Sequence, residues 1–94
     1  MKNLKIVLSN QFRRDLKKLS KRNYDLGRLS DVVDRLARRE HLDLRFHDHN
    51  LSGEFSGFRE CRISPDWLLI YRIEEHDLIL LLMRTGTHAD VLGM

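Results

Sequence analysis

The chain has little cysteine, proline or glycine. Cys61 is its one cysteine and Pro65 its one proline, and only 5 residues are glycine. A single cysteine excludes an intrachain disulfide, so we expect the protein to work in a reducing compartment, the cytoplasm. The glycines form no phosphate-binding loop, which argues against the nucleotide-binding classes that need one.

Long apolar segments are also missing. The apolar run at residues 4–8 is broken by Lys5 and is too short for the core of a signal peptide. No other segment is long enough to cross a bilayer, so we expect no membrane partner.

Charge, by contrast, is plentiful. Charged residues make up 33% of the 94, and 17 Lys and Arg outnumber 14 Asp and Glu, which gives a formal charge of +3. A basic surface attracts polyanions such as nucleic acids, although many proteins are mildly basic. With 41% hydrophobic residues, the length predicts one domain over residues 1–94 with a single core.

The first half of the chain predicts a strand and two helices. Lys5–Leu8 reads as a short strand, and Ser9 or Asn10 can cap the helix that follows. A second helix is predicted over Tyr24–Arg39. Apolar residues recur at helical spacing in both helices: Phe12, Leu16 and Leu19 in the first, and Leu26, Leu29, Val33 and Leu36 in the second.

The second half changes to the period of strands. Phe58–Ile63 alternates as a strand with one wet face, and Trp67–Ile73 reads as a central strand. Ser64–Asp66 forms the turn between them. Glu74–Asp77 is a polar hairpin loop, and the apolar run Leu78–Met83 predicts a strand buried on both faces or nearly so.

The chain then leaves the sheet at Arg84–His88, and Ala89–Met94 forms a helical turn. The predicted fold class is therefore α+β. A short N-terminal strand precedes a two-helix hairpin, which packs on one face of a three- to four-stranded antiparallel sheet. The other face remains for water or a ligand.

Strand alternation brings candidate functional residues together on that second face. Side chains at i and i+2 share a face, so Glu60 and Arg62 point the same way. Arg84 closes the last strand, His88 follows it, and the segment 47–49 with two histidines precedes the meander. If the strands pair simply, a carboxylate, two guanidinium groups and one or two imidazoles share the face.

RNA cleavage by its own 2′-OH requires this kind of set. A base removes the hydroxyl proton, a cation stabilises the phosphorane, and an acid protonates the leaving oxygen. Histidines and carboxylates perform such proton transfers, and arginine binds phosphate oxygens in pairs.

Each residue also has a plainer interpretation. Glu60 and Arg62 could form a surface pair worth roughly 0–1 kcal/mol. Trp67 could be a core anchor, and Cys61, which faces away from Glu60, suits the core better than nucleophilic chemistry. His49 lies two residues from another histidine, but no further spacing supports zinc, so we expect no metal.

Four blocks of the sequence carry a family resemblance. They are Asp48–Gly53 (D-H-N-L-S-G), Gly57–Ile63 (G-F-R-E-C-R-I), Pro65–Tyr71 (P-D-W-L-L-I-Y) and Arg84–His88 (R-T-G-T-H). In this order they resemble the YafQ-type branch of the RelE/ParE toxin superfamily, and the likeness covers essentially the whole chain.

The resemblance implies a type II toxin that cleaves mRNA in the ribosomal A site, through 2′-OH attack and without a metal or other cofactor. It implies three partners: a cognate antitoxin that wraps the toxin, the 70S ribosome with its mRNA, and operator DNA reached only through the antitoxin complex.

It also assigns roles to individual residues. The implied catalytic residues are His49, Glu60, Asp66 and His88. Arg62 and Arg84 are implied to bind the substrate phosphate, and Trp67 and Leu92 to contact a substrate base.

Two departures from the pattern keep other functions open. Related sequences often carry a histidine where this chain has Arg62, and an aromatic residue where it has Leu92. One alternative is a ParE-like poison of DNA gyrase, which shares the fold and has no need of the acid–base set. Another is a catalytically silent protein that only binds its antitoxin.

Overall fold

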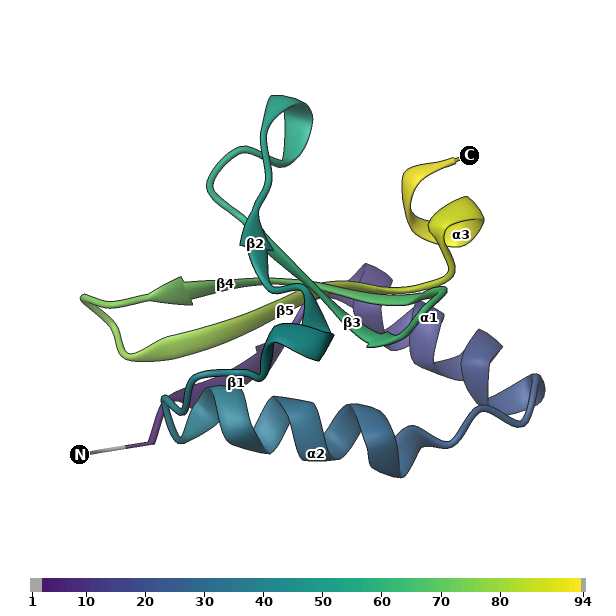
Figure 1. The fold of residues 1–94 in the computed structure, drawn as a ribbon, viewed down its shortest axis with the longest axis horizontal. Helices are drawn as coiled ribbons and strands as arrows, with labels where there is room; N and C mark the ends of the chain where they lie inside the picture. The colour runs from purple at the N-terminus through teal and green to yellow at the C-terminus, as the bar shows by residue number, and fades with distance from the viewer. Residues whose placement is uncertain (1–2, 94) are drawn as a thin grey trace.

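The computed structural model describes residues 3–93, which form an α+β fold with helices packed on a single sheet (Figure 1). The elements in chain order are β1 (Lys5–Leu8), α1 (Asn10–Lys21), α2 (Leu26–Ala37), the short helix η1 (Leu44–Phe46), β2 (His49–Asn50), the short helix η2 (Gly53–Phe55), β3 (Arg59–Ser64), β4 (Trp67–Glu74), β5 (Ile79–Gly86) and α3 (His88–Leu92).

The sheet has five strands in the order β1-β5-β4-β3-β2. Strands β2 to β5 are antiparallel, as predicted, whereas β1 pairs in parallel with β5 through partners such as Lys5 and Ile79. The sheet is thus mixed and wider than the three or four antiparallel strands predicted. The β1 pairing joins distant parts of the chain, and the two-residue β2 is too short to show an alternating pattern.

Both predicted helices are present and pack on the same face of the sheet. Ser9 is the N-cap of α1 and accepts a hydrogen bond from the Phe12 amide at 2.9 Å. Asp25 caps α2, which therefore begins two residues later than predicted, at Leu26. The core joins apolar residues of α1 and α2 to the facing side of the central strands: Phe12, Leu19, Leu29, Val33, Leu36, Cys61, Leu69, Tyr71, Leu80 and Leu82. No helix within residues 3–93 has the length and apolar character needed to cross a bilayer.

The opposite face of the sheet is partly covered. Figure 1 shows α2 below the sheet, with the η2 segment and α3 rising on the other side. Leu68 and Ile70 belong to this second face, yet both are fully buried, and Val91 of α3 is also buried. The candidate site therefore occupies a partly covered surface.

Strand β5 differs from its prediction in two ways. It extends to Gly86, so the expectation that the chain leaves the sheet at Arg84 is wrong. The run is also not buried on both faces, because Leu80 and Leu82 are buried while Leu81 is only partly covered and Leu78 is 40% exposed. A register shift lets Ile70 pair with Arg84.

The side chains of Ser9, the N-cap of α1, and of Asp15 within α1 form hydrogen bonds with the backbone of β5 beyond the end of β1. The Ser9 hydroxyl donates to the Met83 carbonyl at 2.7 Å, and the Asp15 carboxylate accepts from the Thr85 amide at 3.0 Å. These contacts take the place of further pairing with β1, and they explain how β5 can continue past its last pair with that strand.

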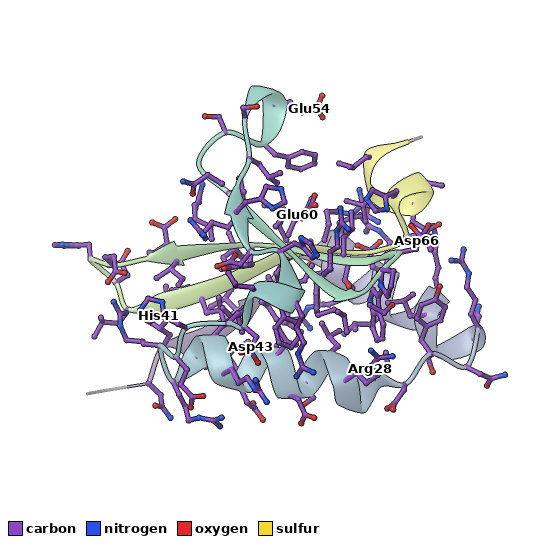
Figure 2. The ribbon with its side chains drawn as sticks, in the orientation of Figure 1. Arg28, His41, Asp43, Glu54, Glu60 and Asp66 are labelled. Carbon is purple, nitrogen blue, oxygen red and sulfur yellow. The ribbon has the colours of Figure 1, made fainter. Side chains whose placement is uncertain are left out.

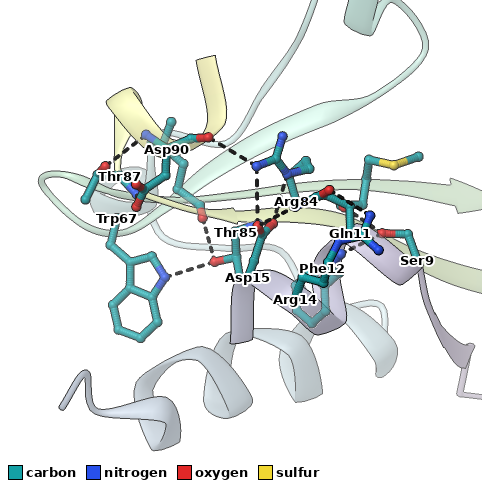
Figure 3. Close-up of polar contacts among 12 residues, drawn as sticks. Ser9, Gln11, Phe12, Arg14, Asp15, Trp67, Arg84, Thr85, Thr87 and Asp90 are labelled. Carbon is teal, nitrogen blue, oxygen red and sulfur yellow. Dashed lines mark hydrogen bonds and ion pairs between the residues drawn. The ribbon is translucent and has the colours of Figure 1, made fainter. Parts of the chain in front are cut away.

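Asp15 also holds Arg84 in a buried ion pair (Figure 3). Arg84 Nε and Nη2 donate to the two Asp15 oxygens at 2.9 and 3.3 Å, and Nη2 donates to the Asp90 carbonyl at 3.1 Å. Asp15 is 3% exposed. The pair connects α1, β5 and α3, and neither helical periodicity nor composition predicts a buried aspartate there.

A second, more exposed ion pair attaches α3 to the end of α1. Arg22 donates to Asp90 at 2.8 and 3.3 Å, and Thr87 and Asp90 form a reciprocal capping box. The hydrogen bond from Arg22, followed by those from Thr87, lowers the pKa of Asp90 to about 2. Asp90 thus stabilises α3 as a carboxylate.

The first prediction concerns the buried pair. Asp15→Asn leaves the Arg84 charge without its counter-charge, so we expect the free energy of unfolding to fall by roughly 3 kcal/mol. Urea unfolding measures it. Arg38→Ala is the control: it breaks an exposed ion pair with Glu40 and should change the free energy of unfolding little. Equal losses in both variants would contradict a special role for Asp15.

The stabilising effect of the Asp90 carboxylate should depend on pH, which is the second prediction. Because the Asp90 pKa is lowered on folding, its contribution to stability is present above about pH 4 and is lost as the pH falls towards 2. The difference in unfolding free energy between the wild type and Asp90→Asn should therefore shrink across that range. A difference that stays constant down to pH 2 would show that the carboxylate charge is not responsible.

Candidate active site

The strand register places the candidate residues in two adjacent rows on the face opposite α2. One row runs His49, Glu60, Ile70, Arg84 across four strands. The next row contains Arg62, which pairs with Leu68. The shared face predicted for Glu60 and Arg62 is confirmed.

His49 forms the first histidine–carboxylate pair of the site. Its Nδ1 lies 2.6 Å from the His47 carbonyl, and its Nε2 lies 3.7 Å from Glu60 Oε1. Since a carbonyl only accepts, Nδ1 carries the proton and Nε2 is the nitrogen that can exchange one. Glu60 is 5% exposed, so its carboxylate lies against the sheet beside the imidazole.

A polar cluster on the other side of β2 holds His49 in place. Asp48 accepts a hydrogen bond from the Tyr71 hydroxyl at 2.5 Å and two from Arg59, at 3.3 and 3.1 Å. Burial, reinforced by the bond to Asp48, raises the pKa of Tyr71, so Tyr71 remains a donor. Sequence reasoning missed this cluster, although the position of Asp48 next to His49 in the D-H block was a signal.

His88 forms the second histidine–carboxylate pair. Its Nδ1 lies 2.7 Å from Asp66 Oδ1, and its backbone amide donates to the same oxygen at 3.3 Å. These bonds lower the pKa of Asp66, which therefore stays ionised and accepts the Nδ1 proton. His88 Nε2 is again the nitrogen left for proton exchange.

Arg62 lies between the two pairs along the sheet. Glu60 precedes it on β3, and Asp66 follows in the turn to β4. Figure 2 shows Glu60 above the middle of the sheet and Asp66 towards the end where α3 lies. Arg62 Nε is buried and has no hydrogen-bond partner within residues 3–93.

Arg84 enters the site already paired. Its Nε and Nη2 are occupied by Asp15 and the Asp90 carbonyl, whereas its Nη1 carries no contact among the residues drawn in Figure 3. Arg84 is thus a rigid cation whose orientation is set by α1 and α3.

The two residues expected to contact a base differ in accessibility. Trp67 is 2% exposed, packs edge-on against Tyr24 and donates from Nε1 to the Thr85 hydroxyl at 2.9 Å. A side chain so buried cannot stack on a substrate base, and the plainer interpretation as a core anchor holds. Leu92 is partly exposed on α3.

The position of Cys61 argues against nucleophilic chemistry at its thiol. Cys61 is fully buried on the helix side, where burial raises its thiol pKa well above the usual range. Among residues 3–93 no three His, Cys, Asp or Glu side chains gather as a metal-binding group.

Comparisons with known proteins agree with the motifs. The model of a family described as "Bacterial toxin of type II toxin-antitoxin system, YafQ" matches residues 4–93. The mRNA interferase toxin YafQ of Escherichia coli K12 is 36% identical over 89 residues, which cover 94% of this chain and 95% of that protein. A putative toxin YafQ of Haemophilus influenzae is 38% identical over 74 residues, 76% of this chain and 72% of that protein.

Solved structures show the same fold. The E. coli DinJ–YafQ toxin–antitoxin complex contains a chain with a TM-score of 0.87 and 35% identity, over 97% of this chain and 99% of that one. A metal-bound toxin from Helicobacter pylori gives a TM-score of 0.88 at 41% identity, over 94% and 98% of the two chains. The chain therefore belongs to the YafQ family of bacterial toxins of type II toxin–antitoxin systems.

Proposed function

We propose that this chain is an mRNA interferase, an endoribonuclease toxin that cleaves mRNA on the ribosome. The observation that carries the proposal is the two histidine–carboxylate contacts, His49 with Glu60 before Arg62 on β3 and His88 with Asp66 in the turn after it. Membership of the YafQ family, whose E. coli relative is named an mRNA interferase, supports it.

The two imidazoles supply the proton transfers. His47 and Asp66 occupy the Nδ1 atoms of His49 and His88, so proton exchange is left to the Nε2 atoms, and that of His49 lies 3.7 Å from Glu60 Oε1. One Nε2 removes the proton of the 2′-OH, and the other donates a proton to the leaving 5′-oxygen. Glu60 lies beside His49 Nε2, and Asp66 orients His88 through Nδ1.

The arginines supply the charge for the phosphate. Attack by the 2′-oxygen makes a phosphorane with extra negative charge, and a guanidinium group binds its oxygens in pairs. Arg62, between the two histidine pairs, is the principal ligand. Arg84 contributes through Nη1 while Asp15 holds its other edge, and Leu92 contacts a base next to the cleaved bond. These roles need no metal or other cofactor.

The proposed partners follow from the same assignment. A cognate antitoxin would neutralise the toxin, as suggested by the relative crystallised with DinJ. The 70S ribosome presents the mRNA in its A site, operator DNA is reached only within the antitoxin complex, and the protein acts in the cytoplasm.

The third prediction tests the histidine chemistry. His88→Gln keeps a polar side chain but cannot shuttle a proton, so ribosome-dependent mRNA cleavage should fall by about 10²–10⁴-fold. Mapping the new 5′ ends of an mRNA bound to ribosomes measures this cleavage. His76→Gln, in the exposed loop between β4 and β5, is the matched control and should cleave normally.

Other outcomes would favour another function. Full cleavage by His88→Gln would remove His88 from the mechanism. Growth arrest without new mRNA ends, together with gyrase-linked DNA breaks, would instead support the ParE-like alternative.

A further inference from the structure

A second positively charged site lies beside the proposed active site. Residues of α2, η1 and the end of β3 line a cavity of about 460 Å³. Its walls carry four arginines and one aspartate: Arg28, Arg35, Arg45, Arg62 and Asp31. Apart from Arg62, these arginines have no role in the proposed cleavage reaction.

Several of these arginines are held in place. Arg28 donates to the Ile63 carbonyl at 3.2 Å. The guanidinium carbons of Arg35 and Arg45 lie 5.9 and 4.8 Å from the centre of the Phe46 ring, which is buried in the wall. Stacking on an aromatic ring orients a guanidinium group and leaves its N–H edge able to bind a ligand.

The carboxylate beside Arg45 does little to cancel this charge. Asp43 lies 3.8 Å from Arg45, but both side chains are about two-thirds exposed, so water screens the pair. Arg62 Nε is buried without a partner inside residues 3–93.

Arg62 makes the cavity continuous with the active site. It lines the cavity and also occupies the row next to His49 and Glu60. An RNA strand whose scissile phosphate lies near Arg62 must continue past it on both sides, and its phosphates repeat at every nucleotide. One direction leads over the β3 end into the cavity.

We propose that this cavity binds a backbone phosphate of the RNA next to the scissile one. The inference rests on the proposed function. The chemistry favours a phosphodiester, because arginines recognise its paired oxygens and such interactions fix the register of a strand without reading its sequence. Phe46 and Pro65 offer an apolar wall for the adjoining ribose.

The fourth prediction tests this site by RNA binding. The probe is a short single-stranded 2′-O-methyl RNA, which lacks the attacking hydroxyl, measured by fluorescence anisotropy at several salt concentrations. In the double variant Arg35→Gln/Arg45→Gln the affinity should fall about tenfold. The slope of log affinity against log salt should become shallower by about 0.7 for each phosphate that the variant no longer neutralises.

The matched control is Arg13→Gln/Arg14→Gln, which removes the same charge from exposed positions of α1. It should bind nearly as well as the wild type. Replacing single phosphates of the probe by neutral methylphosphonates should weaken binding at one position in the wild type, and not in the cavity variant.

The outcomes separate this inference from the proposed function. Equal losses of affinity in the cavity and control variants would overturn the phosphate site, even if the wild type cleaves mRNA. Loss of antitoxin binding with unchanged RNA binding would overturn it too and assign the cavity to an acidic peptide. Cavity-dependent RNA binding without any mRNA cleavage would uphold the site and contradict the nuclease.

Discussion

The ion pair between Asp15 and Arg84 is the interaction on which the site depends most. Asp15 binds the Thr85 amide as well as Arg84, and Arg84 continues to the Asp90 carbonyl. The same groups thus extend β5 beyond its last pair with β1, attach α1 to that edge and hold α3 over the sheet. Without them His88, at the start of α3, would lose its fixed distance from Asp66. Burying such a pair is costly, and its value here lies in fixing one arrangement of three elements.

The two histidines use a common device. Each imidazole binds a fixed acceptor through Nδ1, the His47 carbonyl or the Asp66 carboxylate, which leaves Nε2 as the nitrogen that can exchange a proton. The backbone and side chains behind them are themselves anchored, by Asp48 with Tyr71 on one side and by the capping box of α3 on the other. Proton transfer needs groups held in position before the substrate arrives, and this arrangement provides that.

Local patterns in the sequence predicted the elements well, because helix periodicity, strand alternation and the Ser9 cap depend on neighbours in the chain. They also placed Glu60 and Arg62 on one face. What they could not predict depends on distant residues: the parallel pairing of β1, the buried Asp15 that prolongs β5, and the cluster that holds Asp48. Trp67 shows the limit of a family motif, since its position in the P-D-W block suggested substrate contact while packing buries it. The arginine cavity was missed because its lining comes from three separate segments.

The proposed chemistry requires both imidazoles to carry the proton on Nδ1 and to exchange protons through Nε2. Nitrogen NMR shifts of His49 and His88, recorded above the pH at which the rings titrate, measure the tautomer directly. We expect the Nδ1-protonated form for both histidines. In Asp66→Ala we expect the nitrogen shifts of His88 to change and those of His49 to stay the same. Finding the Nε2-protonated form at either histidine, with the fold intact, would contradict the proposed arrangement of the site.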